Sequence, residues 1–202
     1  GVVPREESDA LGDSEALNRR RGYDANLWSF EDLETALATA HGLQVPVYVT
    51  LNRYYAPVQH AGVLRLIGEL HERDVDGLIV VDPGLLLLLK ARGPRFRNLA
   101  VGTGCSTFNS HTVAFYRSLG ATRVILSRHL TVSEVEKIAG CSPPDVELEA
   151  FILNSLCPFE DGFCSFYHGH DPPRTAGSGL RTGCLPSYDP WFEGVGCRMV
   201  FD

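Results

Sequence analysis

Four of the six cysteines in the chain lie near its carboxyl end, and their spacing could serve one metal centre. Cys157, Cys164, Cys184 and Cys197 are separated by six, nineteen and twelve residues. Glycines and prolines are frequent between them, so no long helix or strand is expected there. An irregular segment of this kind can hold a fixed shape if four thiolates bind one metal centre.

The residues alone leave the kind of centre open. All-cysteine zinc sites usually contain pairs separated by about two to four residues, and this set contains no such pair. A 4Fe–4S cluster accepts wider spacing because its ligands bind separate iron atoms. We therefore expect a 4Fe–4S cluster. Zinc is the alternative, and buried cysteines that bind no metal are the third interpretation.

Other candidate catalytic residues follow expected strands or lie in them. Cys105 comes after a strand, and as a nucleophile it would need a base such as His129 or His111. Arg128 comes directly after another strand, and Glu149 lies in a third. These positions make Cys105, Arg128 and Glu149 the candidate catalytic residues.

The two carboxylates of the last expected strand allow two interpretations. Glu147 and Glu149 are two residues apart, so both point to the same face of a strand. Carboxylates facing the inside of a barrel could do acid–base work. Alternatively, they form a polar layer with Arg123 or Arg128, and the pattern favours neither interpretation.

Length, charge and cysteine content limit the class of protein. The chain has 202 residues, 44% of them hydrophobic, which is enough for one domain with a sizeable core. The net charge of −7 argues against a broad nucleic-acid-binding face, although it allows a local basic patch. The longest apolar run, Leu85 to Leu89, is too short to insert into a membrane. Six cysteines without a signal peptide favour metal or redox chemistry and a cytoplasmic location.

The elements that must position these residues alternate along the chain. Strands are expected at 45–51, 77–82, 99–103, 122–127 and 146–153, and helical patterns lie between them. Such alternation is typical of a parallel α/β sheet. No glycine-rich phosphate-binding fingerprint follows a strand, which weakens the doubly wound alternative. Polar residues collect after every strand, as in barrels, so we expect a TIM-type (β/α)8 barrel.

Several motifs, in one order along the chain, resemble peptidase family U32, the collagenase-like proteins. They are Asn109-Ser110, the stretch 119–128 (LGATRVILSR), Asp145 to Glu149 (DVELE), Cys157-x6-Cys164, Arg181-Thr182-Gly183-Cys184 and Cys197-Arg198. The resemblance covers roughly residues 45–198. It implies one barrel domain over residues 1–202, with βα units in 1–156 and a cysteine-rich, cluster-binding segment in 157–202. It also implies that the first βα unit and the last strand are missing.

The resemblance implies a function as well. Some members of the family are similar to oxygen-independent hydroxylation proteins that act on ubiquinone precursors, ribosomal RNA or transfer RNA. The ubiquinone group resembles this chain in its cysteines, which there bind a 4Fe–4S cluster. The resemblance therefore implies an iron–sulfur enzyme for a small aromatic or RNA substrate. It also implies a second family member as the partner in a heterodimer. A collagenase-like peptidase and a non-catalytic scaffold with a four-cysteine metal site are the alternatives.

Overall fold

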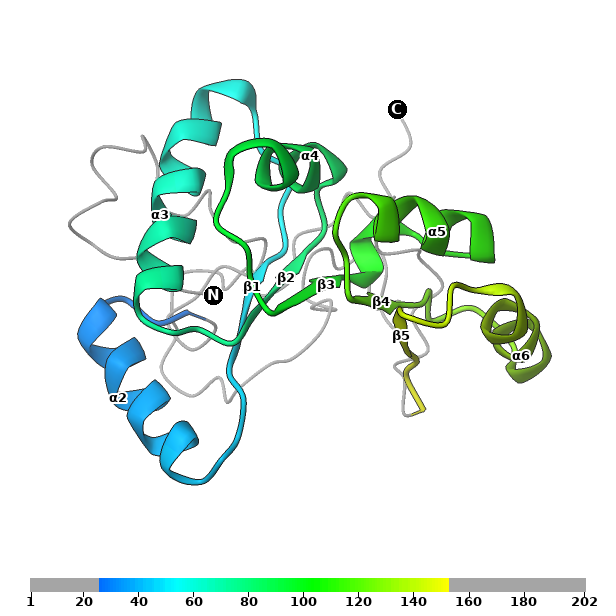
Figure 1. The fold of residues 1–202 in the computed structure, drawn as a ribbon, viewed down its shortest axis with the longest axis horizontal. Coiled ribbons are helices and arrows are strands. Elements are labelled where there is room, and N and C mark those ends of the chain that lie inside the picture. Colours follow the sequence, from blue (N-terminus) through cyan, green and yellow to red (C-terminus); the bar gives the residue numbers. More distant parts are fainter. Residues whose placement is uncertain (1–25, 153–202) are drawn as a thin grey trace, which may run out of the picture.

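Residues 26–152 are described by the structure, which is a computed structural model. Five strands and five α-helices alternate in this part of the chain (Figure 1). The strands are β1 (Tyr48–Leu51), β2 (Gly77–Val80), β3 (Asn98–Val101), β4 (Arg123–Ile125) and β5 (Glu147–Glu149). The helices are α2 (Phe30–Gly42), α3 (His60–Glu72), α4 (Pro83–Arg92), α5 (Ser110–Ser118) and α6 (Val132–Cys141), with short 3-10 turns η3 (Pro57–Gln59) and η4 (Thr103–Cys105).

The five strands form one parallel sheet whose order in space is their order in the chain, β1-β2-β3-β4-β5. A doubly wound sheet would reverse its order at a switch point, and no reversal occurs among the described strands. Because crossovers between parallel strands are right-handed, a sequential order places all the helices on one face. Figure 1 shows α3, α4, α5 and α6 following one another along that side. The arrangement is compatible with part of a barrel, and the closed eight-stranded barrel stays a prediction.

The hydrophobic core lies between the sheet and its helices. On α3, buried residues recur at helical spacing, and each side chain contributes about 1.5–3 kcal/mol by leaving water. They are Val63, Leu66, Ile67 and Leu70. Alternate strand residues, such as Leu78, Val80 and Val101, pack against them. The opposite face of the sheet therefore carries the intervening residues.

The face of the sheet away from the helices carries polar side chains, and two of them, from β1 and β4, approach each other closely. Arg123 on β4 lies with its guanidinium carbon 5.4 Å from the ring centre of Tyr48 on β1. Three strand spacings separate these strands, about 14 Å in a flat sheet. Gly77 on β2 leaves room for the Tyr48 ring, because a Cβ there would lie 2.7 Å from its Cε1 atom. The contact favours a sheet that is concave on this face.

Helix starts follow the local sequence closely. The hydroxyl of Ser29 accepts the Asp32 N–H and caps α2. The cap of α6 is Thr131. The Glu134 carboxylate accepts the Thr131 N–H at 2.8 Å, which completes a capping box. No described helix has the length and apolar character needed to cross a membrane.

Candidate functional site

The loops that follow the strands all lie at one edge of the sheet, because the strands are parallel. This carboxyl edge collects Tyr54 and Asp82 after β1 and β2, the turn at Cys105 after β3, and Arg128 after β4. In parallel α/β proteins, ligands bind at this edge. The fold therefore brings together several of the residues that the sequence singles out.

Asp82 is a buried carboxylate that ties two of these loops together. Its Oδ2 accepts the Tyr55 N–H at 3.0 Å, and its Oδ1 accepts the Gly84 N–H at 2.8 Å in the first turn of α4. Burial, and next the charge of Asp82, raise the pKa of the Tyr55 hydroxyl above its ordinary value. Tyr55 thus stays a neutral phenol, and Asp82 serves here as a connector between β1 and α4.

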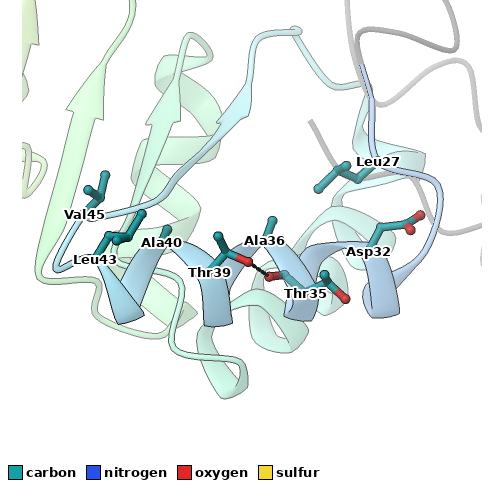
Figure 2. A pocket seen from close by; sticks show the side chains of 8 residues that line it. All are labelled: Leu27, Asp32, Thr35, Ala36, Thr39, Ala40, Leu43 and Val45. Carbon is teal, nitrogen blue, oxygen red and sulfur yellow. Dashed lines mark hydrogen bonds between the residues drawn. The ribbon is translucent and has the colours of Figure 1, made fainter.

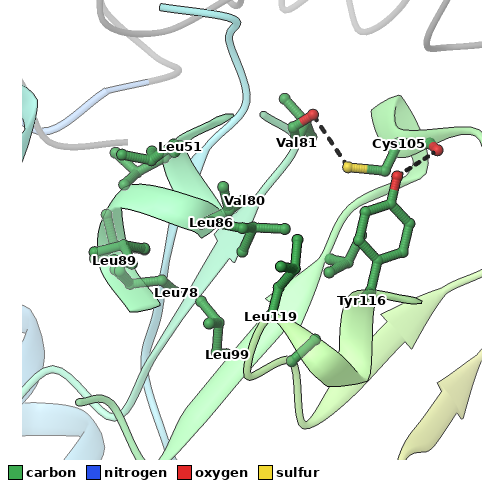
Figure 3. Packing of buried hydrophobic residues seen from close by; sticks show 14 of the residues in the cluster. Leu51, Leu78, Val80, Val81, Leu86, Leu89, Leu99, Cys105, Tyr116 and Leu119 are labelled. Atoms are coloured by element: carbon green, nitrogen blue, oxygen red, sulfur yellow. Dashed lines mark hydrogen bonds between the residues drawn. The ribbon is translucent and has the colours of Figure 1, made fainter. Parts of the chain in front are cut away.

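Cys105 is buried in the turn after β3, beside the end of β2 and the side chain of Tyr116 on α5. Figure 3 shows its thiol directed at the Val81 carbonyl, 3.1 Å away, while the Tyr116 hydroxyl donates to the Cys105 carbonyl at 3.1 Å. Burial raises the pKa of the Cys105 thiol to about 11. A thiol that is protonated at neutral pH is a poor nucleophile. The geometry thus gives Cys105 a packing role, and its catalytic role stays a prediction.

The turn after β3 is held tightly against β2. A Cβ on Gly102 would lie 2.8 Å from Val81 Cγ1, and one on Gly104 would lie 3.0 Å from Val81 Cβ. The Tyr54 hydroxyl donates to the Gly104 carbonyl at 2.5 Å and so brings its ring, which is 48% exposed, over this turn. Only residues without a side chain fit between Val81 and the turn, which fixes its position.

Two hydroxyls in the same turn have no hydrogen-bond partner within residues 26–152. Thr107 is completely buried, and its Oγ1 is unpaired, as is the buried Oγ of Ser106. Ser106 also adopts the left-handed conformation with φ 50°, which costs energy for a residue other than glycine. Unpaired buried hydroxyls and a strained residue are both unfavourable, and such features gather at functional sites.

Glu149 lies in the sheet and is part of an ionic row on the concave face. Arg123 donates to Glu147 through Nε at 2.8 Å and lies 3.5 Å from Glu149 through Nη1. The hydrogen bond to Glu147 raises the pKa of Arg123. Leu148, between the two carboxylates, packs against the core instead. Both glutamates lie on one face, as expected, and both pair with Arg123. The catalytic role of Glu149 stays a prediction.

Of the remaining candidates from the sequence, two lie at the carboxyl edge and four lie outside the described residues. Arg128 is half-buried and His129 exposed at the carboxyl edge, where the His129 N–H lies 3.4 Å from Ser127 Oγ. Cys157, Cys164, Cys184 and Cys197 lie outside the described residues. Within residues 26–152, no group of histidine, cysteine and carboxylate side chains could hold a metal ion.

A recess also lies away from the carboxyl edge, along α2. Figure 2 shows it between Leu27, the α2 helix and the turn that carries Leu43 and Val45. Its volume is about 630 Å³, and Asp32 is its one ionisable lining residue. Its lining offers little acid–base chemistry, so we place the candidate site at the carboxyl edge.

Sequence reasoning missed three contributors to the site. Tyr116 and Thr107 were not singled out, although an Asn cap at Asn109 already marks the start of the helix behind them. Gly104 was not recognised as the acceptor for Tyr54, because a backbone carbonyl carries no sequence signal.

Comparisons with known proteins agree with this geometry. A model of the family described as peptidase family U32 matches residues 11–188. The tRNA hydroxylation protein P of Escherichia coli K12 is 32% identical over 139 residues, 69% of this chain and 30% of that protein. The 23S rRNA 5-hydroxycytidine C2501 synthase of the same organism is 29% identical over 156 residues, 77% of this chain and 22% of that protein. The chain thus spans less than a third of either relative.

One solved structure, the U32 peptidase Mk0906, matches with a TM-score of 0.53. The match covers 74% of this chain and 58% of the chain in that structure. Its 19% sequence identity shows a likeness of fold alone. The family model spans most of the sequence and the parallel, sequentially ordered sheet agrees with it, so the chain belongs to peptidase family U32.

Proposed function

We propose that this chain takes part in the hydroxylation of an RNA base, bound at the carboxyl edge of the sheet. The observation that carries the proposal is that two relatives, at 32% and 29% identity, are named for hydroxylation of tRNA and of 23S rRNA. Those names favour RNA over a ubiquinone precursor as the substrate. A second family member as partner stays a prediction.

The proposed cofactor is a 4Fe–4S cluster on Cys157, Cys164, Cys184 and Cys197. The fit rests on the chemistry of the donor set, since four thiolates suit an iron–sulfur cluster. Such a cluster, when bound, supplies one-electron redox chemistry. We infer that the reaction needs no molecular oxygen, as the resemblance to oxygen-independent hydroxylation proteins implies.

The carboxyl edge offers side chains that suit a nucleobase. The ring of Tyr54 is half exposed and held by its bond to Gly104, so it could stack on a base. Arg128 lies at the same edge, and a guanidinium there can pair with a phosphate or a base edge. Peptide hydrolysis is less favoured, because the raised pKa of Cys105 keeps its thiol protonated.

Nucleoside analysis tests the reaction directly. Deletion of the gene in the source organism should remove, from tRNA or rRNA, a nucleoside that carries one extra oxygen atom. Mass spectrometry of digested RNA would detect this loss. A gene carrying Cys157→Ser should fail to restore the nucleoside, whereas Cys141→Ser, at an exposed cysteine outside the proposed set, should restore it. An unchanged nucleoside profile after deletion would refute the proposal.

Anaerobic purification tests the cofactor separately. The protein should be brown, absorb at about 400 nm and bleach with dithionite if the four thiolates hold a cluster. Iron and sulfide should fall in the Cys157→Ser and Cys184→Ser variants and stay unchanged in Cys141→Ser. A colourless protein with one zinc ion would support the structural-metal alternative instead.

A further inference from the structure

A long part of the described chain carries positive charge only. Residues 83–133 contain seven lysines and arginines and neither aspartate nor glutamate. The net charge of −7 therefore combines +7 in this stretch with −14 in the rest of the chain. Four of the seven cations fall within eight residues, at Lys90, Arg92, Arg95 and Arg97, where α4 ends and β3 begins. A surface segment of one sign attracts ligands of the opposite sign.

Two of these four residues, Lys90 and Arg95, line a recess of about 330 Å³ at the amino edge of the sheet, opposite the candidate active site. Its lining comes from the end of α4, the loop 93–96, the start of β3 and the end of α5. The charged residues among its described lining residues are Lys90, Arg95 and Arg117, all of them cations. The described lining thus contains positive side chains and no carboxylate.

The ends of α4 and α5 also meet here, and their free carbonyls would repel an anion. The fold neutralises them locally. Lys90 Nζ donates to the Ser118 carbonyl at 2.7 Å, and the Gly93 N–H donates to the Leu89 carbonyl at 2.9 Å. The Leu119 and Gly120 N–H groups close the last turn of α5. The helix ends therefore do not cancel the charge of the loop.

Three arginines of the segment remain available to a ligand. Arg92, Arg95 and Arg97 are exposed, and none makes a hydrogen bond or ion pair within residues 26–152. Arg117, in contrast, donates to both carboxylate oxygens of Asp145 at 2.8 Å. Unpaired arginines that are close together in the chain suit phosphates, because each guanidinium can donate two parallel hydrogen bonds to phosphate oxygens.

We infer that Arg92, Arg95 and Arg97, with the recess beside them, form a docking site for the phosphate backbone of an RNA substrate. The inference rests on the proposed function, which makes RNA the ligand to be held. A structured RNA is much longer than β3, which spans roughly 13 Å, so it can contact this edge while one of its bases lies at the other. The site would add affinity without reading sequence, as phosphate contacts do.

Binding of labelled tRNA to the full chain, measured by fluorescence anisotropy at several salt concentrations, tests the inference. The triple variant Arg92→Gln/Arg95→Gln/Arg97→Gln should bind at least tenfold more weakly. Its slope of log affinity against log salt should be shallower by about 2–3, because each lost phosphate contact removes roughly 0.7–0.9. The triple arginine-to-lysine variant should keep most of the slope, since it keeps the charge.

A matched control separates this site from general charge effects. Arg65, on α3, is also an exposed arginine without a hydrogen bond or ion pair in the described residues. Arg65→Gln should leave tRNA affinity unchanged, whereas Arg95→Gln alone should lower it several-fold. Equal effects of these two substitutions would overturn the inference, as would unchanged binding in the triple glutamine variant. Thermal melting of each variant verifies that it is folded.

The outcomes also distinguish this site from the proposed function. Equal tRNA affinity in wild type and triple variant refutes the docking site, while the nucleoside analysis still decides the hydroxylation. If polyglutamate displaces the tRNA as well as an RNA of equal charge does, the site prefers acidic proteins and the RNA assignment is wrong. Failure of the wild-type chain to bind tRNA also overturns the inference.

Discussion

Single residues fix the carboxyl edge of the sheet through hydrogen bonds that link segments distant in the chain. Asp82 holds the backbone of Tyr55, and the thiol of Cys105 reaches the Val81 carbonyl. Both side chains are buried, so each bond replaces water that the group has lost. Loss of either bond leaves an unpaired polar group inside the protein, and its cost can be measured.

Asp82→Asn is expected to destabilise the fold by about 1–3 kcal/mol, because an amide can accept only one of the two N–H bonds and presents donors to the other. Asp74→Asn is the matched control, since Asp74 is exposed and its left-handed φ of 57° suits asparagine. It should change stability by less than about 0.5 kcal/mol. Denaturant unfolding measures both, and equal losses would contradict the connector role.

Cys105 should react slowly with iodoacetamide at mildly alkaline pH. With a pKa of about 11, its thiolate fraction is about 100-fold lower than that of an ordinary thiol. The rate should rise as the pH approaches that pKa. Exposed Cys141 is the internal control and should be alkylated first. Peptide mapping by mass spectrometry gives both rates, and fast labelling of Cys105 in the folded protein would revive its nucleophilic role.

At the scale of elements, helix caps decide where the chain enters each crossover. Thr131 and Ser133 both carry a hydroxyl at the start of α6, and the structure assigns the cap to Thr131, whose hydroxyl accepts the Glu134 N–H. The bonds from the Thr131 N–H and hydroxyl lower the pKa of Glu134. The stabilisation from the charged carboxylate is therefore present at neutral pH and is lost as acid protonates Glu134.

Substitution at both positions tests this assignment. Thr131→Ala should cost about 1 kcal/mol near neutral pH, and Ser133→Ala should be neutral or slightly stabilising, because it lies inside the helix. The difference between the two variants should shrink in acid, where Glu134 becomes protonated. Urea unfolding at both pH values checks the prediction, and a larger loss for Ser133→Ala would show that the assigned cap is wrong.

The sequence predicts the five described strands but not their ends. The expected strand 45–51 pairs only from Tyr48, because its partner strand begins at Gly77. The expected strand 146–153 pairs only over Glu147–Glu149, and Phe151 and Ile152 are exposed. Ladder pairing is a property of two strands, so a pattern within one strand cannot locate it.

The start of α4 carried a signal that the sequence analysis did not use. The expected strand 77–82 ends with Asp82, whereas in the structure Asp82 is the N-cap of α4 and Pro83 its first residue. Proline is common at that position because its missing N–H would be unpaired there. The candidate site was predicted less well, since the partners of Tyr54 and Cys105 are backbone carbonyls, which any residue supplies.

At the scale of the whole molecule, the concave face depends on a glycine, Gly77, whose lack of a side chain leaves room for its neighbours. Gly77 on β2 lies opposite Asn98 on β3 and next to the Tyr48 ring. An added methyl group would lie 2.6 Å from the Asn98 carbonyl oxygen, which belongs to the backbone and cannot swing away. The approach of Tyr48 to Arg123 therefore requires glycine at this position.

Gly77→Ala and Gly68→Ala should change stability in opposite directions. Gly77→Ala should cost about 1–3 kcal/mol, because the strands must move apart. Gly68 lies in α3 with no atom within 4 Å of an added Cβ, so alanine there should add up to about 1 kcal/mol through helix propensity. Thermal unfolding of both variants measures the difference, and stabilisation by Gly77→Ala would rule out the close approach.

The sequential order of the strands has a consequence for local opening. Each described strand hydrogen-bonds only to the strands before and after it in the chain, so the sheet holds together through neighbouring pairs. β3 is flanked by two strands on either side, while β5 contributes a ladder of three residues at one flank. Protection against amide hydrogen exchange should therefore rise from the flanks towards β3, whose amides should exchange with deuterium last.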